Sequence, residues 1–261
     1  MSNVHNLVDN LHIEDLQNET HPSIFDENDG YEMLILRLPV LLDEMKVTST
    51  GFIITPENSY LYMRDKKELK PLGSRFEAPY EILDGIVDEL LKAFDSYRDL
   101  IEDIEESLYL NKATNSFMNR WLKLKRNIVR IERILTHASS TMDETIAYYK
   151  KCDDFPLNHY LDLHEHLERT LRSASLQLSK LDYIYKFYTT QTNERINRSI
   201  FALTIISAIF LPLNLIVGFF GMNTSGLPFS DGLSGTNSVL ILMVSLSVIA
   251  FLAIYFMKRK I

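Results

Sequence analysis

Cysteine is nearly absent from this 261-residue chain, which contains one, Cys152. A single thiol can form neither an internal disulfide framework nor a four-thiolate metal site, and it is typical of a reducing compartment. The sequence also lacks a Gly-rich phosphate loop and any nucleophile at an informative spacing from a base. These absences argue against an enzyme.

Charged side chains are almost missing beyond Arg198, where the only ones are Asp231, Lys258, Arg259 and Lys260. The preceding part is rich in acids, and the whole chain has a net charge of −8. This balance argues against nucleic acid as a partner, because phosphate binding needs a net basic face. It suits a protein that attracts cations. The first residues are polar and acidic, so we expect no signal peptide.

The uncharged region contains two apolar runs, 200–220 and 239–257, separated by a short polar loop. Each run is about as long as a helix that crosses a ~30 Å hydrocarbon core. We therefore predict a transmembrane hairpin over 196–261, with spans at about 199–220 and 239–257 and Gly221-Met222-Asn223 at the turn. A pair of buried helices in a soluble core is the alternative, but such long uncharged runs with basic flanks are uncommon there.

The basic residues around the runs predict their orientation in the membrane. Arg195 and Arg198 precede the first run and the basic tail 258–260 follows the second, whereas the loop 221–238 has no Lys or Arg. By the positive-inside rule, both termini are cytoplasmic and the turn faces outward. We expect a multi-pass protein of the cell (inner) membrane, in contact with the lipid bilayer.

The part before the apolar runs divides into a small α+β unit, 1–78, and a helical domain, 79–195. In the first, helical spacing within 4–17 predicts one or two short helices. Alternating patterns predict strands at 31–38, ended by Pro39, and at 47–54 and 59–63, in a sheet of three or four strands. The fold class is therefore mainly α, with an α+β portion.

The helical domain begins with an acidic helix from about Pro79 and continues with a basic helix over 117–149. Their opposite signs predict an antiparallel hairpin with complementary charged faces. Part of the acidic surface could instead hold divalent cations or serve in regulation, and the candidates are Asp84, Asp88, Asp95, Asp99 and Glu102.

A third helix is predicted from after Pro156 through Arg195 into the first span. A helix of that length with sustained apolar periodicity needs partners, which indicates a bundle or a coiled oligomer. It carries His164-Glu165-His166, close to His159 and Asp162. Residues two apart face different sides of a helix and no His-Glu-x-x-His motif is present, so we favour a solvated face over a zinc site.

The first span is not uniformly apolar, as a simple anchor would be. Thr204, Ser207, Asn214 and Gly218 interrupt it, and Ser207 and Asn214 share a helix face. Helix packing could explain most of them, but the carboxamide of Asn214 needs partners in hydrocarbon and can coordinate a hydrated cation. An apolar face with uncharged polar groups suits a narrow pore. The second span has fewer polar residues and is the better candidate for facing lipid.

Residues 197–223, NRSIFALTIISAIFLPLNLIVGFFGMN, resemble the first transmembrane segment and signature of the CorA family of divalent cation transporters. The resemblance implies a funnel-shaped homopentamer that takes up Mg²⁺, or Co²⁺ and Ni²⁺, without a cofactor other than a transported or regulatory cation. It implies a selectivity mouth at Gly221, Met222 and Asn223, and metal contacts by Asn223 and Asn214. The implied pore-lining residues are Asn197, Ile200, Leu203, Thr204, Ser207, Leu211, Asn214 and Gly218.

Two alternatives stay open at this point. The loop after Asn223, from Thr224 through Pro228 to Asp231, resembles that of the ZntB-like branch, which is associated with zinc. The ion, the direction of transport and any proton coupling are therefore open. A membrane-tethered coiled-coil scaffold or sensor without conduction would also fit a long helix followed by a membrane hairpin.

Overall fold

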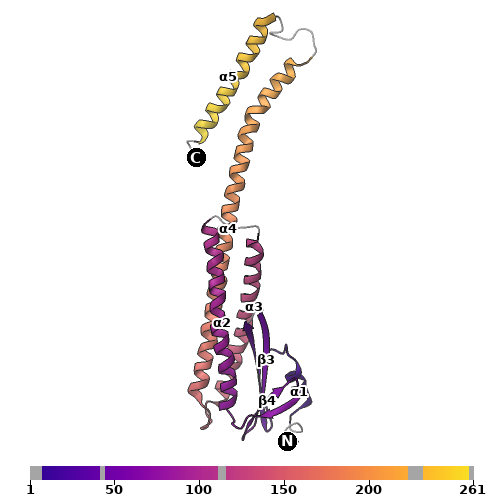
Figure 1. The fold of residues 1–261 in the computed structure, drawn as a ribbon, viewed down its shortest axis with the longest axis vertical. Helices are drawn as coiled ribbons and strands as arrows, with labels where there is room; N and C mark the ends of the chain where they lie inside the picture. Colours follow the sequence, from indigo (N-terminus) through magenta and orange to yellow (C-terminus); the bar gives the residue numbers. More distant parts are fainter. Residues whose placement is uncertain (1–7, 42–44, 111–115, 223–231, 259–261) are drawn as a thin grey trace. The chain divides into compact units, whose positions relative to one another are not determined.

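The computed structural model describes residues 8–41, 45–110, 116–222 and 232–258 (Figure 1). The chain forms two compact units, Met1–Lys186 and Phe187–Ile261. The first contains a short helix, five strands and three long helices, the last of which continues into the second unit. The elements are α1 (Asn10–Gln17), β1 (Ile24–Asn28), β2 (Tyr31–Leu41), β3 (Met45–Ile54), β4 (Ser59–Met63), β5 (Glu68–Pro71), α2 (Glu77–Tyr109), α3 (Phe117–Tyr149), α4 (Leu157–Phe220) and α5 (Gly232–Lys258).

The five strands form one antiparallel meander in the order β1-β2-β3-β4-β5. The prediction of three or four strands missed β1 and β5, which are short and partly charged. A signal for β1 was present: Asn28 pairs with Tyr31 across the two-residue turn Asp29-Gly30. Gly30 has a φ of 86°, which a tight hairpin turn of this kind requires and glycine adopts easily.

The prediction that Pro39 ends its strand is wrong. β2 continues through Leu41, and Pro39 pairs with Val47 of β3. The strand on the other side, β1, pairs with β2 only as far as Ile35. Pro39 therefore lies beyond the end of β1, where a missing N–H removes no hydrogen bond to that strand.

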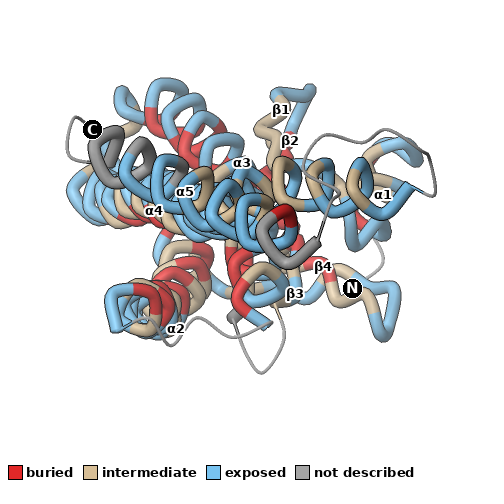
Figure 2. The backbone as a smooth tube through the Cα atoms, turned by 90° about the horizontal axis from the view of Figure 1, so that it is seen from above, coloured by how far each residue is buried: buried red, intermediate tan, exposed pale blue. Residues whose placement is uncertain are grey.

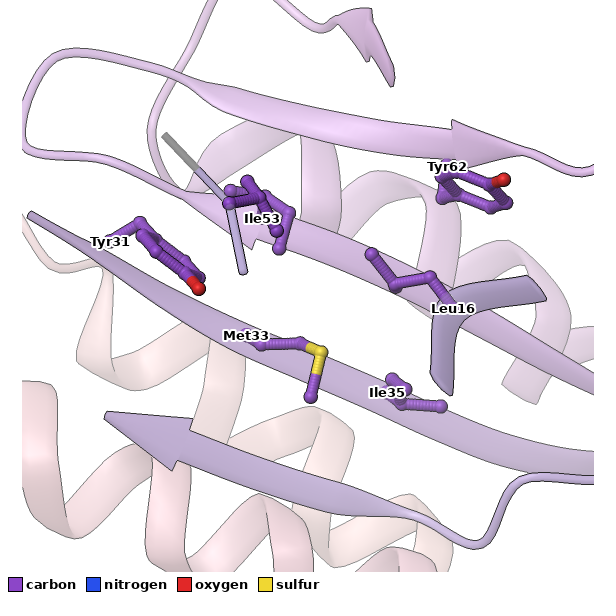
Figure 3. Close-up of a cluster of buried hydrophobic side chains, with 7 residues drawn as sticks. Leu16, Tyr31, Met33, Ile35, Ile53 and Tyr62 are labelled. Atoms are coloured by element: carbon purple, nitrogen blue, oxygen red, sulfur yellow. The ribbon is translucent and has the colours of Figure 1, made fainter. Parts of the chain in front are cut away.

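One face of the sheet is covered by α1. Asp9 caps this helix, since its carboxylate accepts a hydrogen bond of 2.8 Å from the backbone N–H of Leu11. Leu16 is fully buried over Gly51, whose missing side chain leaves room for the leucine. Figure 3 shows Leu16 beside the side chains of the central strands. This cluster of buried side chains consists of Val8, Leu16, Tyr31, Met33, Ile35, Ile53 and Tyr62.

The other face packs against α2 and α3, so β2 is buried on both sides. Four consecutive residues of β2, Met33 to Leu36, are therefore at most 1% exposed, and polar and apolar residues do not alternate there. Two hydrogen bonds attach the sheet to the end of α3: Tyr148 and Tyr149 donate to the carboxylate of Glu32 at 3.1 and 2.9 Å.

The three long helices pack through apolar stripes, and the buried residues lie along one side of α2 and of α3 (Figure 2). The first part of α4 contacts both neighbours. Trp121 of α3 donates to the carbonyl of Leu181 at 2.8 Å, and Lys180 pairs with Glu105 of α2 at 2.7 Å. The predicted continuous helix from after Pro156 through the first apolar run is confirmed.

The prediction of complementary charged faces between α2 and α3 is wrong for the part of the chain that the structure describes. The ion pairs found between long helices there involve α4, such as Lys125–Asp182 and Lys180–Glu105. Between α2 and α3 the contact is apolar, with one polar link in which Asn127 donates to the Tyr97 hydroxyl at 3.2 Å. Because the buried stripes of the two helices face inward, most charged residues point to solvent.

In the second unit, α4 continues to Phe220 and α5 extends from Gly232 to Lys258. By length and composition, α4 is the one helix among the described residues that could span a membrane. The described part of α5 contributes a shorter apolar stretch, Gly235–Ile249.

Candidate functional site

In the second part of α4, six polar or glycine residues and two apolar ones follow a seven-residue repeat. Starting from Asn197, steps of three and four residues alternate up to Gly221. Side chains at this spacing lie on one side of a helix, and a strict repeat of seven is typical of helices that supercoil around one another. We call these residues the α4 stripe: Asn197, Ile200, Thr204, Ser207, Leu211, Asn214, Gly218 and Gly221. Leu203, also predicted to line a pore, lies directly beside it.

Among the described residues, none of the stripe is buried: Ser207 is half-buried and its other members are exposed. None of the most apolar 18-residue window of α4 is buried. Leu203, Leu211 and Leu215 are 64%, 68% and 75% exposed, although they lie at different angles around the axis. A helix that is apolar all round must be surrounded by lipid or by other helices. The stripe is the side on which polar groups call for a partner other than lipid.

The backbone of α4 stays helical through the stripe, including at Pro212. A proline inside a helix donates no hydrogen bond, which leaves the carbonyl of Ala208, four residues earlier, without its helical donor. The Thr204 hydroxyl donates to the Ile200 carbonyl at 2.9 Å within the same helix. The Thr204 hydroxyl thus has a hydrogen-bond acceptor within the helix, whereas the carboxamide of Asn214 is exposed.

The helix ends at Phe220, and the backbone N–H of the next residue, Gly221, donates to the Val217 carbonyl at 2.8 Å. A Cβ on Gly221 would lie 2.9 Å from that same oxygen, closer than real Cβ atoms approach. Glycine is therefore required sterically at the first position of the predicted mouth. Met222 is 52% exposed, and its N–H approaches the Phe219 carbonyl at 3.4 Å. Asn223 lies outside the described residues.

The acidic surface contains one cluster that could hold a metal ion among the described residues. It is formed by Asp84 and Asp88 of α2 and His166 of α4, whose ligand atoms all lie within 4.8 Å of one another. The two aspartates are four residues apart and so share one side of α2. We call Asp84, Asp88 and His166 the α2–α4 cluster. Carboxylate oxygens suit Mg²⁺, and adding an imidazole extends the range to Zn²⁺, Co²⁺ and Ni²⁺.

Further carboxylates surround this cluster. Asp162 approaches the His166 imidazole at 3.9 Å, and the other ring nitrogen, Nδ1, is buried with no hydrogen-bond partner among the described residues. Burial, followed by the negative charges of Asp84, Asp162, Asp88 and Glu77, raises the pKa of the nearby Tyr80 hydroxyl. The local field is thus negative, which favours a bound cation.

The five acidic residues singled out in the sequence lie in different surroundings, and their role in cation attraction or regulation stays a prediction. Asp84 and Asp88 come together, but Asp95, Asp99 and Glu102 are exposed, and Asp95 pairs with Arg98 at 3.4 Å. Sequence reasoning missed the contribution of His166, because the distance between α2 and α4 cannot be read from spacing. The signal that could have pointed to it is Asp162, one helical turn before His166.

The prediction that His164 and His166 lie on a solvated face is wrong. Their side chains are 15% and 25% exposed, because α4 has neighbours on two sides. His164 lies 2.9 Å from the Ser139 hydroxyl of α3, whereas His166 faces α2. The expectation that residues two apart face different sides of the helix is confirmed.

Among the described residues, the chain thus combines an apolar helix that is long enough to span a membrane with a separate cluster of potential metal ligands. Residues 3–259 match the family described as CorA-like Mg²⁺ transporter protein, and the chain belongs to that family. The family resemblance noted in the sequence is confirmed, and it is a resemblance to transporters.

Individual relatives are distant in sequence but similar in fold. The chain is 25% identical over 184 residues to the cobalt/magnesium transport protein CorA of Thermotoga maritima, an alignment that covers 69% of this chain and 51% of that protein. The complete structure of the CorA magnesium transporter from Methanocaldococcus jannaschii matches with a TM-score of 0.74 and 17% identity, over 98% of this chain and 84% of that one. Full-length CmaX matches with a TM-score of 0.72 and 17% identity, over 97% and 81%. The chain spans about half the length of the first curated relatives it matches.

Proposed function

We propose that this protein transports divalent metal cations, chiefly Mg²⁺ but also Co²⁺ and Ni²⁺, through a path lined by the α4 stripe of several copies. The observation that carries the proposal is the seven-residue repeat, six of whose eight members are polar or glycine, on a stretch of α4 in which no described residue is buried. The repeat supplies a face on which copies can meet, and its polar members supply contacts for a hydrated ion. Family membership supports the same conclusion.

The chemistry of the path is uncharged. Mg²⁺ loses water reluctantly and is usually held through part of its hydration shell. The carboxamide oxygen of Asn214 can accept hydrogen bonds from that shell without the tight binding that a carboxylate would cause. Leu211, one turn before it, supplies an apolar constriction that can empty of water. In a homopentamer, as the family resemblance implies, each position becomes a ring, and Asn223 forms the outer one.

The orientation follows from the basic residues. Arg195 and Arg198 lie before the apolar run of α4, and the basic residues after the second run lie at the end of the chain. Both ends are therefore placed in the cytoplasm, and Gly221-Met222-Asn223 at the outer surface. The unit formed by Met1–Lys186 is then cytoplasmic, and its acidic surface concentrates cations on that side.

We assign the α2–α4 cluster a regulatory role on the cytoplasmic side. A cation held by Asp84, Asp88 and His166 would link α2 to α4, the helix that continues into the membrane. Binding there neutralises carboxylates that otherwise repel one another. Cation occupancy and the packing of α4 are thereby coupled, since a ligand stabilises the state that binds it.

Zinc transport, as in the ZntB-like branch, is the second candidate. It is favoured by His166, because an imidazole is a good zinc ligand and a poor magnesium ligand. The residues that carry the sequence resemblance to that branch, Thr224 to Asp231, lie outside the described residues. The two candidates differ in the ion that moves, so selectivity measured in one assay distinguishes them.

The test is ion flux into liposomes that contain the full-length protein, with Mg²⁺ and Zn²⁺ measured separately by entrapped dyes. We expect flux above that of empty liposomes, a large loss with Asn223→Ala, and no loss with Ile216→Leu, a control on the side of α4 opposite the stripe. Faster Zn²⁺ flux than Mg²⁺ flux would favour the ZntB-like candidate. If the flux were the same in empty liposomes, with the protein and with every variant, transport would be contradicted. That result would favour a membrane-tethered scaffold or sensor without conduction.

A further inference from the structure

A strongly basic cleft lies between α2, α3 and the start of β3, away from the α2–α4 cluster. Its volume is about 690 Å³, within the range of small-molecule sites. Five of its lining residues are basic and all five belong to α3, and none of its described lining residues is acidic. The basic residues are Arg120, Lys123, Arg126, Arg130 and Arg133.

These cations are unusual in an acidic protein. The chain has a net charge of −8, yet all five are exposed and none forms an ion pair with a residue that the structure describes. Lys125, which lies between two of them in sequence, shows the contrast: it faces α4 and pairs with Asp182 at 2.6 Å. The five recur every three or four residues, so they form one stripe along about 20 Å of helix. Like charges gathered in this way repel one another.

A second hollow of about 250 Å³ adjoins the cleft and shares Arg130 and Arg133 with it. Arg37 of β2 and His137 also line this hollow. Burial, followed by the charges of Arg130 and Arg133, lowers the pKa of Arg37. The Nε atom of Arg37 is buried and has no hydrogen-bond partner among the described residues. Three guanidinium groups thus converge without a described anion to balance them.

The opposite side of the cleft is aromatic and apolar. Tyr97 and Leu100 of α2 line it, and Val129 adds an apolar side chain from α3; Leu100 and Val129 are 43% and 44% exposed. The hydroxyl of Tyr97 accepts a hydrogen bond of 3.2 Å from Asn127, which fixes the ring at the edge of the cleft. One side of the cleft therefore offers hydrogen-bond donors for anionic oxygens, and the other offers a surface on which a planar ring can pack.

We propose that this cleft binds an oligophosphate anion, with Arg130 and Arg133 holding the phosphate groups, and that a nucleoside triphosphate is the form that suits its aromatic side. Guanidinium groups match phosphate oxygens in pairs of parallel hydrogen bonds, and several of them are needed to balance a triphosphate. A contact with an acidic surface of another copy is the competing explanation. The concave shape and the ring surface favour a small ligand, because a contact between copies needs neither.

The test is isothermal titration calorimetry on the full-length protein in detergent, with a chelator present so that divalent cations take no part. The probes are ATP, inorganic triphosphate and, at matched ionic strength, sulfate. We expect ATP and triphosphate to bind. The double variant Arg130→Gln/Arg133→Gln should weaken the affinity for both at least about tenfold. The matched control, Lys92→Gln/Arg169→Gln, removes two exposed charges elsewhere and should leave affinity unchanged. Tighter binding of ATP than of triphosphate would assign a role to the aromatic side.

Three results would overturn the proposal. Sulfate could bind as tightly as triphosphate, or the cleft and control variants could lose affinity equally; either would reduce the effect to general charge attraction. The cleft variant could instead change the oligomeric state while triphosphate binding stays the same, which would assign the cations to a contact between copies. Thermal unfolding of both variants shows whether each is folded, and bound triphosphate should raise the Tm of the control but not of the cleft variant.

Discussion

The two parts of α4 have similar apolar spacing but opposite surroundings. From Tyr160 to Ile184, a buried residue recurs about once per turn, and Leu163, Leu167 and Leu181 are completely buried. From Ile196 to Phe219, most large apolar side chains are exposed, among them Leu211 at 68% and Leu215 at 75%. The apolar side chains in the first part of this helix are therefore buried by the same chain, whereas most of those in the second part are not.

This difference shows where function is to be sought. In the first part, the polar residues His164 and Thr170 are held by neighbours or by their own helix, as in any folded core. In the second part, Ser207 and Asn214 occupy repeat positions, where Ser207 is half-buried and Asn214 is exposed among the described residues. Polar groups on an uncovered apolar helix are costly in a membrane unless they meet water, an ion or another polar group. The α4 stripe therefore supports the proposal that several copies meet along it.

The same substitution should have very different effects in the two parts of α4. Leu181→Ala removes a fully buried side chain and should destabilise the fold by about 2–5 kcal/mol, since it leaves a cavity. Leu211→Ala should leave the unfolding of the Met1–Lys186 unit unchanged and alter ion flux instead. Thermal unfolding followed by circular dichroism, together with the liposome assay, measures both. Equal destabilisation by the two variants would show that the second part is also packed within the chain.

A cation bound at the α2–α4 cluster would stabilise only the packed part of α4. Mg²⁺ or Zn²⁺ at 100 times its dissociation constant should stabilise the protein by about 2.7 kcal/mol. Asp84→Asn/Asp88→Asn should abolish that gain, which a shift in Tm or in resistance to proteolysis would report. Asp95→Asn/Asp99→Asn removes the same charge outside the cluster and serves as control. Loss of the gain in both variants would indicate unspecific screening.

Gly221→Ala tests the end of the exposed part. The added Cβ would meet the Val217 carbonyl, so the last turn must shift at a local cost of about 1–3 kcal/mol. We expect reduced flux with an unchanged Tm of the packed unit. Gly218→Ala is the control, because a Cβ there has no atom within 4 Å. Equal flux loss in both variants would point to the width of the stripe rather than to the geometry of the helix end.

Alkaline pH should destabilise only the packed unit, and this is the smallest of the expected effects. Burial and the charge of Glu32 raise the pKa of Tyr148 to about 12 and also raise that of Tyr149. Unfolded tyrosine has a pKa of about 10. The stabilisation is complete below pH 10 and is lost as the pH rises from 10 towards 12, because the unfolded chain releases protons that the fold retains. Glu32→Gln should flatten this dependence, as measured by Tm between pH 8 and 11; an unchanged slope would contradict the assignment to these tyrosines.

Much of the architecture could be predicted because it follows from periodicity. The long helices, the strands β3 and β4, and the continuous α4 all arise from patterns within single segments. The strands β1 and β5 were missed because Asp26, Glu27 and Glu68 leave few apolar positions to alternate. The extent of β2 was misjudged because the effect of Pro39 depends on where a neighbouring strand ends.

The sites divide in the same way. The α4 stripe could be read from the sequence, since all its members belong to one helix. The α2–α4 cluster and the basic cleft could not, because each depends on which side of a helix faces which neighbour. Charge complementarity suggested that the acids of α2 meet the bases of α3, but apolar burial outweighs exposed ion pairs, which contribute at most about 1 kcal/mol. The basic side chains of α3 consequently point to solvent.

The central claim is that the α4 stripe lines a water-filled path for divalent cations. Its most direct test is thiol accessibility in liposomes, in a Cys152→Ser background with Asn214→Cys or Ile216→Cys. We expect a membrane-impermeant thiol reagent to modify the cysteine at 214, more slowly when Mg²⁺ is present, and to leave the cysteine at 216 unmodified. Equal reactivity at both positions, or none at 214, would contradict it.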